Sequence, residues 1–221
     1  MKSLEVVSKQ VGLLFLLQMA AAVSANLILV SLLSQPEYLV ALSEQSYLIG
    51  ASSLLFLVCF ISIVLISILV YPLLDKYSPA TAKSYFAMRV SEAVIQLIGV
   101  VALLSLIPLS QQIANTDVNH SSLFVFAKQL TNANLYAYHL AMIVLGLGSL
   151  PFCYLLYRHS LIPRLLASLG LLGYLILATS SCFYLLGQDL GLVVTLPVFV
   201  FEVGIGFWLL FKGFKADPLS D

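Results

Sequence analysis

Six apolar runs, each about as long as a membrane is thick, constrain this sequence more than any other feature. A transmembrane helix needs about 20 predominantly apolar residues to cross the roughly 30 Å hydrocarbon core of a bilayer. The runs occupy residues 11–33, 47–74, 85–109, 135–157, 165–186 and 192–211. We therefore predict an all-α fold, a polytopic transmembrane helix bundle of six spans in which residues 1–221 form a single integral membrane domain.

The composition agrees with a membrane protein and excludes most soluble classes. Charged residues make up 9% of the chain, against about a quarter in an ordinary soluble domain. Ten basic and ten acidic residues cancel, so the net charge favours no nucleic acid partner. The lipid bilayer is the partner that the composition predicts. A small-molecule or ion ligand is compatible with it, and protein partners are not indicated.

The first run also admits a different interpretation. Val23-Ser24-Ala25 followed by Asn26 resembles a signal-peptidase site, so a cleaved signal peptide is an alternative to a retained span. The apolar run continues past this point to Leu33. That continuation favours a retained first helix.

Residues 110–134 form the longest polar segment of the chain. Pro108 is predicted to end the third helix just before it, and Asn115–Asn119 has the composition of a loop. Apolar residues then recur at near-helical spacing between Leu123 and Leu130. This pattern predicts a short amphipathic helix lying on the membrane surface in the outer loop.

The basic residues predict the orientation. Eight of them fall on the same side as the amino terminus when the spans alternate: Lys2, Lys9, Lys76, Lys83, Arg158, Arg164, Lys212 and Lys215. Only Lys128 lies in the opposite loops, and Arg89 lies inside a span. By the positive-inside rule we expect both termini to be cytoplasmic.

The third run carries charge where lipid cannot tolerate it. Arg89, Glu92 and Gln96 follow one another at offsets of three and four, on a helical stripe that also holds Tyr85 and Gly99. A charged side chain near the bilayer centre costs roughly 2.5 to 3.5 kcal/mol on insertion scales. This stripe should therefore face the interior of the bundle.

Two further polar residues lie at comparable depth in other spans. Glu202 is near the middle of the sixth run and Gln18 is in the first. We predict a buried polar centre made of Arg89, Glu92, Gln96, Glu202 and Gln18. Two carboxylates sharing one cation keep one excess negative charge unless one of them binds a proton, an arrangement that proton-coupled transport or cation binding uses.

Structural interpretations of the same residues stay open. Arg89 paired with Glu92 or Glu202 can simply lock the packing of the third and sixth spans. Arg89 also begins close enough to the interface to extend its side chain toward water, which would leave both glutamates to other partners.

No pattern indicates an enzyme or a cofactor. His139, in the fourth span, is a further candidate, but a lone histidine there is more typical of a hydrogen-bonded packing residue. The three histidines lie at different depths, which argues against haem or a catalytic zinc ion. The cysteines, Cys59, Cys153 and Cys182, all fall inside apolar runs. We expect no metal, no cofactor and no catalytic residue.

Three segments together resemble a known family. They are Met88-Arg-Val-Ser-Glu92, Leu161-Ile-Pro-Arg-Leu-Leu-Ala-Ser-Leu-Gly-Leu-Leu-Gly-Tyr174 and Pro197-Val-Phe-Val-Phe-Glu-Val-Gly-Ile-Gly-Phe-Trp-Leu-Leu-Phe-Lys-Gly213. The chain is similar in these segments to the bacterial membrane family catalogued as domain of unknown function 4386. The resemblance implies six helices in a bacterial cytoplasmic (inner) membrane and no known activity. The family pattern is matched at Arg89, Glu92, Pro163, Arg164, Glu202, Trp208 and Gly213.

Three functions remain as hypotheses. The first is a non-enzymatic membrane protein of accessory, sensory or scaffold type with a buried Arg/Glu centre. The alternative is a small transporter or ion/proton-coupled carrier that uses Glu92 and Glu202, each on the third span of one half of the chain. The second alternative, an intramembrane enzyme, lacks a complete nucleophile, base or metal set.

Overall fold

A computed structural model describes residues 4–35, 38–114 and 121–215, and these residues form helices and no strand. The helices are α1 (Leu4–Leu33), α2 (Tyr38–Tyr77), α3 (Pro79–Leu104), α4 (Leu106–Ala114), α5 (Ser121–Arg158), α6 (Arg164–Leu185) and α7 (Leu196–Phe211), with a 3-10 turn, η1 (Leu192–Thr195), before α7. Six helical stretches are long and apolar enough to cross a membrane. The prediction of an all-α bundle with six membrane-competent helices is confirmed.

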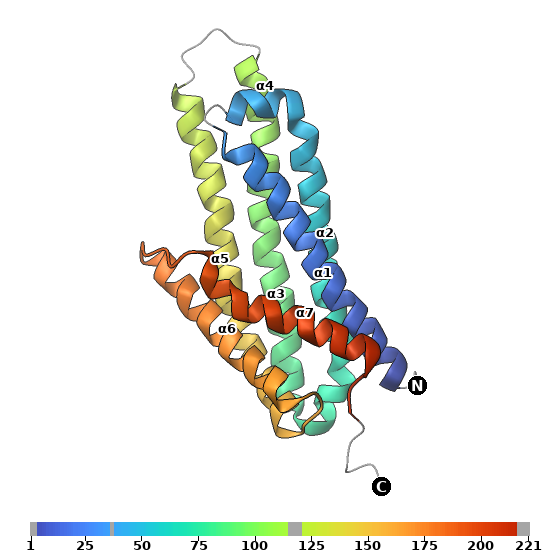
Figure 1. The fold of residues 1–221 in the computed structure, drawn as a ribbon. Helices are drawn as coiled ribbons and strands as arrows, with labels where there is room; N and C mark the ends of the chain where they lie inside the picture. Colours follow the sequence, from blue (N-terminus) through green and yellow to red (C-terminus); the bar gives the residue numbers. More distant parts are fainter. Residues whose placement is uncertain (1–3, 36–37, 115–120, 216–221) are drawn as a thin grey trace.

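The six long helices form a closed ring. Each packs against its neighbours in the order α1, α2, α3, α5, α6 and α7, and α7 packs back against α1 (Figure 1). The short helix α4 continues beyond α3 and packs on α2. Buried side chains fill the middle of the ring, so long polar residues on non-adjacent helices can meet there.

The third span is interrupted earlier than the sequence suggests. Pro108 was predicted to end the helix, but α3 ends at Leu104 and α4 continues through Pro108 to Ala114. A proline ring clashes with the carbonyl group four residues earlier, which here is that of Leu104. The break therefore falls before the proline, and the chain resumes a helical path beyond it.

The outer segment also differs from the expectation. The loop predicted at Asn115–Asn119 lies outside the described residues, and the helix expected from Leu123 to Leu130 is the first part of α5. No glycine or proline occurs between Ser121 and Gly146, so nothing separates a surface helix from the span. Its apolar residues, such as Phe124, pack on the core near the beginning of α2.

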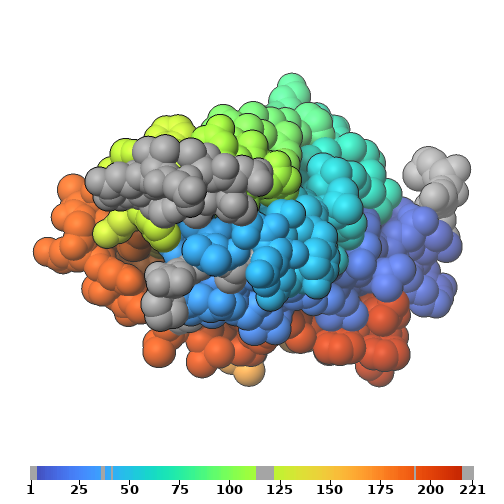
Figure 2. All heavy atoms as spheres, turned by 90° about the horizontal axis from the view of Figure 1, so that it is seen from above, coloured from blue at the N-terminus to red at the C-terminus, as the bar shows by residue number. Residues whose placement is uncertain are grey.

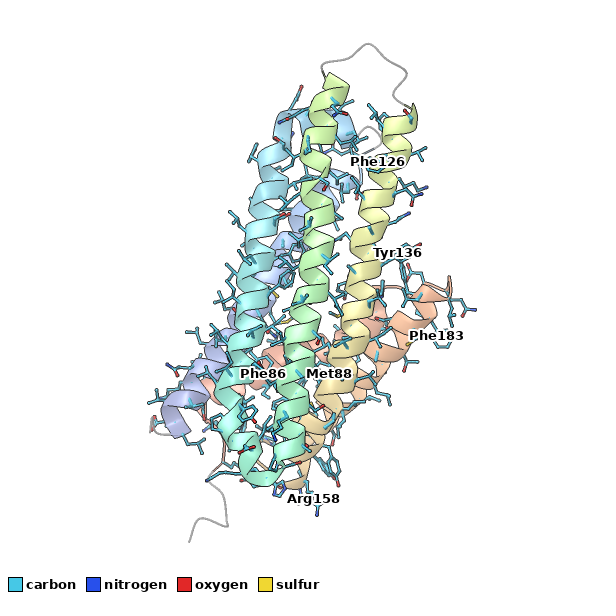
Figure 3. All side chains as sticks on the ribbon, turned by 180° about the vertical axis from the view of Figure 1, so that it is seen from behind. Phe86, Met88, Phe126, Tyr136, Arg158 and Phe183 are labelled. Carbon is cyan, nitrogen blue, oxygen red and sulfur yellow. The ribbon has the colours of Figure 1, made fainter. Side chains whose placement is uncertain are left out.

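The helices differ greatly in length. At 1.5 Å per residue, the 38 residues of α5 extend about 57 Å, whereas the 22 residues of α6 extend about 33 Å. Phe126 accordingly lies on a part of α5 beyond the level of Tyr136 and of Phe183 on α6 (Figure 3). One end of the bundle thus consists of α1, α2, α4 and α5 without cover from α6 and α7.

The chain is anchored at the other end of the bundle. Gly213 terminates α7 with φ +72°, in the left-handed region that favours glycine, and its N–H donates to the Trp208 carbonyl oxygen. The Phe214 N–H then donates to Ser8 Oγ at 3.0 Å, and the Lys215 N–H donates to the Leu161 carbonyl oxygen at 2.9 Å. The beginning of α1 and the end of α7 therefore lie together.

We expect Ser8→Ala to loosen this anchor. Ser8 is fully buried, and without its hydroxyl group the Phe214 N–H has no acceptor there. Leaving a buried donor unpaired costs about 1–3 kcal/mol. Limited proteolysis should cleave the variant after α7 faster than the wild type, whereas Ser31→Ala, which removes an exposed hydroxyl group on the same helix, should not change the rate. Equal rates in all three proteins would contradict the anchoring role.

A candidate buried polar centre

Helix α3 places an ion pair inside the ring. Arg89 and Glu92 are each only 1% exposed, and Arg89 Nη1 lies 2.9 Å from Glu92 Oε2. One turn earlier, the Tyr85 ring lies 5.9 Å from the guanidinium carbon. One turn later, Gln96 Nε2 donates to Glu92 Oε1 at 3.2 Å. The predicted stripe of α3 therefore faces the interior, because helical offsets of three and four align these residues.

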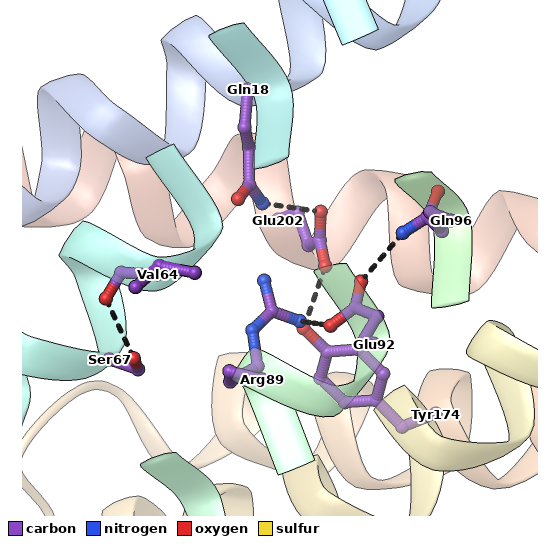
Figure 4. A network of polar contacts seen from close by, with 8 residues as sticks. All are labelled: Gln18, Val64, Ser67, Arg89, Glu92, Gln96, Tyr174 and Glu202. Carbon is purple, nitrogen blue, oxygen red and sulfur yellow. Dashed lines mark hydrogen bonds and ion pairs between the residues drawn. The ribbon is translucent and has the colours of Figure 1, made fainter. Parts of the chain in front are cut away.

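Glu202 enters the same interior from α7. Its side chain is nearly buried, with Oε1 accepting a hydrogen bond from the Tyr174 hydroxyl group of α6 at 2.8 Å. Its Oε2 accepts a second hydrogen bond from Gln18 Nε2 of α1 at 3.0 Å. Helices α1, α3, α6 and α7 thus contribute to one cluster, which Figure 4 shows with its dashed contacts.

The centre contains more negative than positive charge. The Arg89 guanidinium interacts electrostatically with Glu92 and with Glu202, and the two carboxylates repel one another. Among the described residues, no other cation acts on either carboxylate. If both glutamates are ionised, the centre therefore carries a net charge of one negative unit in a low-dielectric interior.

Several polar atoms of the centre keep bonding capacity. Arg89 Nε and Gln18 Oε1 are buried and form no hydrogen bond with the described residues. The Arg89–Glu92 pair is in ion-pair contact, but Nη1 is not aligned for a hydrogen bond with Oε2. Because buried polar groups are normally paired, these atoms are the positions at which the centre can still form hydrogen bonds.

The structure brings together the five residues of the predicted centre: Gln18, Arg89, Glu92, Gln96 and Glu202. The alternative in which Arg89 extends toward the membrane surface is wrong for this structure, because its side chain is buried against Glu92 and Tyr85. Arg89 and Glu92 lie one turn apart on α3, so they can pair on the inner face of this helix without a charged partner from another helix.

His139 lies outside this centre. Its Nδ1 atom is 3.2 Å from Ser181 Oγ, and its ring stacks on Tyr184 with centroids 3.7 Å apart. Both partners belong to α6. The residue therefore acts as a hydrogen-bonded packing contact between α5 and α6. Within the described ranges, no group of three histidine, cysteine or acidic side chains is arranged to hold a metal ion.

Sequence reasoning missed Tyr174, which donates the shortest hydrogen bond to Glu202. A tyrosine is common in membrane helices, so residue type alone did not mark it. A signal was available in its position, because Tyr174 follows Gly173 and shares the helix face of Gly170. Glycines at such spacing indicate the side of a membrane helix that contacts its neighbours.

Comparison with known proteins identifies one relationship. A family model described as a domain of unknown function (DUF4386) matches residues 10–213. The match includes all residues of the buried centre and ends at Gly213, so Ser8, Phe214 and Lys215 of the anchor lie outside it. Neither a curated protein nor a solved structure matches the chain.

Proposed function

The chain belongs to the DUF4386 family, and we propose that it is a multi-pass membrane protein that binds one proton or one small monovalent cation at its buried centre. The ligand is held between Glu92 and Glu202, and the protein works as a small ion-coupled carrier. Each carboxylate comes from the third long helix of its half of the chain, Glu92 from α3 and Glu202 from α7.

The charge imbalance supports this proposal. Glu92 and Glu202 share the single cation Arg89, and all three side chains are withdrawn from solvent. Removing an uncompensated ion from water costs several kcal/mol even after relaxation. One added positive charge neutralises the centre, and a proton or a dehydrated monovalent cation supplies it with the least volume.

The geometry around the carboxylates supports a reversible site. Glu202 receives hydrogen bonds from two uncharged donors, Gln18 and Tyr174, which belong to different helices. If Glu202 gains or loses a proton, the amide and hydroxyl groups of these donors can rotate to adjust their hydrogen bonds. Because both donors are uncharged, this change leaves no other buried ion without a partner. Arg89 Nε and Gln18 Oε1 keep one donor and one acceptor for the same purpose. Gain or loss of one positive charge can therefore shift helices α1, α6 and α7 relative to α3.

Ion flux in proteoliposomes tests the proposal. In vesicles that contain the wild type and an internal pH dye, the internal pH should move toward the external pH when a proton gradient is imposed. Gradients of Na⁺ or K⁺ test whether these cations cross the membrane instead. We expect Glu202→Gln to reduce the flux by at least about tenfold. In this variant Glu92 alone balances the charge of Arg89, so the centre no longer needs a bound cation. Glu44→Gln, which changes an exposed carboxyl group of α2, should leave the flux unchanged.

A second function, an accessory or scaffold protein braced by the same centre, is favoured by one observation. Each carboxylate already has partners within the protein, Arg89 and Gln96 for Glu92 and two neutral donors for Glu202. In that case no gradient produces flux, and Glu202→Gln lowers only the thermal stability. Those two results together would replace the carrier proposal with the scaffold.

We further propose that the chain lies in a bacterial cytoplasmic membrane, with the beginning of α1 and the end of α7 on the cytoplasmic side. The distribution of basic residues supports this orientation: seven described basic residues lie at the anchored end. A reporter enzyme that works only in the cytoplasm should be active when it is fused after Lys215, and one that works only in the periplasm should be inactive there. Activity of a periplasmic reporter at the same position would reverse the orientation.

A further inference from the structure

A cleft opens at the end of the bundle that α6 and α7 do not cover. Its volume is about 430 Å³, within the range of small-molecule sites. Helices α1, α2 and α5 meet there, and Figure 2 looks down on this end, with the beginning of α2 beside that of α5. The lining residues are Leu33, Tyr38, Phe124, Val125, Lys128, Thr131 and Asn132.

The lining has two chemically different parts. Leu33, Phe124 and Val125 form an apolar wall, and the Tyr38 ring packs edge-on against Phe124 with centroids 6.4 Å apart. Lys128, with Thr131 and Asn132 beyond it, follows along the same helix. The cleft is therefore amphipathic, and its ligand should have an apolar part next to a polar part.

Among the described residues that line the cleft, Lys128 is the only charged one. Lys128 is exposed and has no ion-pair partner among the described residues, and within those ranges no acidic side chain lines the cleft. Lys128 is also isolated from the other cations. Apart from Arg89, the remaining basic residues of the described ranges gather at the opposite end of the bundle: Lys9, Lys76, Lys83, Arg158, Arg164, Lys212 and Lys215.

The position of the cleft matches the membrane surface. The 38 residues of α5 extend about 57 Å, well beyond a hydrocarbon core of about 30 Å, so its first turns reach the lipid headgroups or pass them. Val125 is 62% exposed beside the cleft. An apolar side chain so exposed next to the exposed ammonium group of Lys128 matches the boundary between acyl chains and headgroups.

We propose that this cleft binds an anionic phospholipid. Lys128 contacts the headgroup phosphate, the Asn132 amide provides a hydrogen-bond donor, and the first part of one acyl chain lies along Leu33, Phe124 and Val125. The bound lipid ties the beginning of α5 to the end of α1 and the beginning of α2. The site is separate from the buried centre and does not depend on the carrier proposal.

Binding of a fluorescent phosphatidylglycerol to the purified chain in detergent, followed by anisotropy, tests the site. The wild type should bind saturably, with unlabelled phosphatidylglycerol competing and phosphatidylcholine competing poorly. Lys128→Gln should weaken binding about fivefold, the factor expected for one lysine at an anionic surface. Lys128→Arg should retain the affinity. Lys83→Gln, which removes an exposed lysine at the other end, should leave binding unchanged.

Two further measurements separate a lipid from other ligands. Val125→Asn should weaken binding of the lipid, because it places an amide on the apolar wall, while glycerol phosphate alone should not displace the probe at matched concentrations. Equal binding by the wild type and Lys128→Gln would overturn the proposal. Equal competition by phosphatidylcholine would also overturn it, as would displacement by glycerol phosphate, which would indicate a soluble anion.

Discussion

Arg89→Met is expected to destabilise the protein by about 3–5 kcal/mol, the effect of removing one partner from a buried ion pair. Glu92 would lose its ion-pair contact at 2.9 Å, and Glu202 would lose the only cation that acts on it among the described residues. Two buried carboxylates would then face each other without compensation. The unfolding free energy in mixed detergent micelles, measured by titration with a denaturing detergent, gives the comparison.

The double variant Arg89→Met/Glu92→Gln identifies the cause. It removes both members of the pair, so it should recover most of the stability that the single variant loses. Arg164→Met, which removes a cation from the surface at the beginning of α6, should change stability by less than about 0.5 kcal/mol. Equal losses in the single and double variants would show that Arg89 acts through packing instead of charge.

Gly12→Ala is expected to destabilise the protein by about 3 kcal/mol, at the upper end of the range for overpacking. A Cβ atom at Gly12 would lie 2.6 Å from the Leu210 backbone nitrogen and 2.7 Å from the Gly206 carbonyl oxygen. Backbone atoms cannot rotate away as a side chain can, so α1 and α7 would have to separate. The hydrogen bond from Gln18 to Glu202 crosses the same pair of helices and should lengthen.

Gly50→Ala is the matched control. A Cβ atom at Gly50 of α2 would meet nothing within 4 Å, so the higher helix propensity of alanine should raise stability by up to about 1 kcal/mol. Both variants are compared with the wild type by the same titration. A neutral Gly12→Ala would mean that α1 and α7 do not pack as closely as the structure has them.

Hydrophobicity and charge made much of the fold predictable. Runs long enough to cross a bilayer leave few alternatives to helices, because lipid satisfies no backbone hydrogen bond. Arg89 and Glu92 were predictable as inward-facing for a related reason, since their offset of three places both on a stripe that lipid would penalise. Their approach to Glu202 was a hypothesis based on depth alone, because helix order in the ring is set by side-chain packing on every helix at once.

Other features depend on contacts between distant segments. Gly173 lets α6 approach Val198 near the beginning of α7, and at this close contact Tyr174 donates to Glu202. The extension of α5 toward Ser121 depends on packing of Phe124 against the beginning of α2, which competes with a position on the membrane surface. Periodicity measures which face of a helix is apolar, but it does not distinguish lipid from protein as the neighbour.

Infrared difference spectroscopy of the protonated carboxyl group tests the central claim most directly. Purified protein in lipid is measured as wild type, Glu92→Gln and Glu202→Gln, over a range of pH and with or without Na⁺ and K⁺. We predict a protonated-carboxyl band in the wild type that disappears reversibly when pH or cation concentration rises. The band should be absent from both variants, because one remaining carboxylate balances Arg89. A wild-type spectrum that never changes with pH or cations, or a band that persists in both variants, would contradict a shared, exchangeable positive charge at the centre.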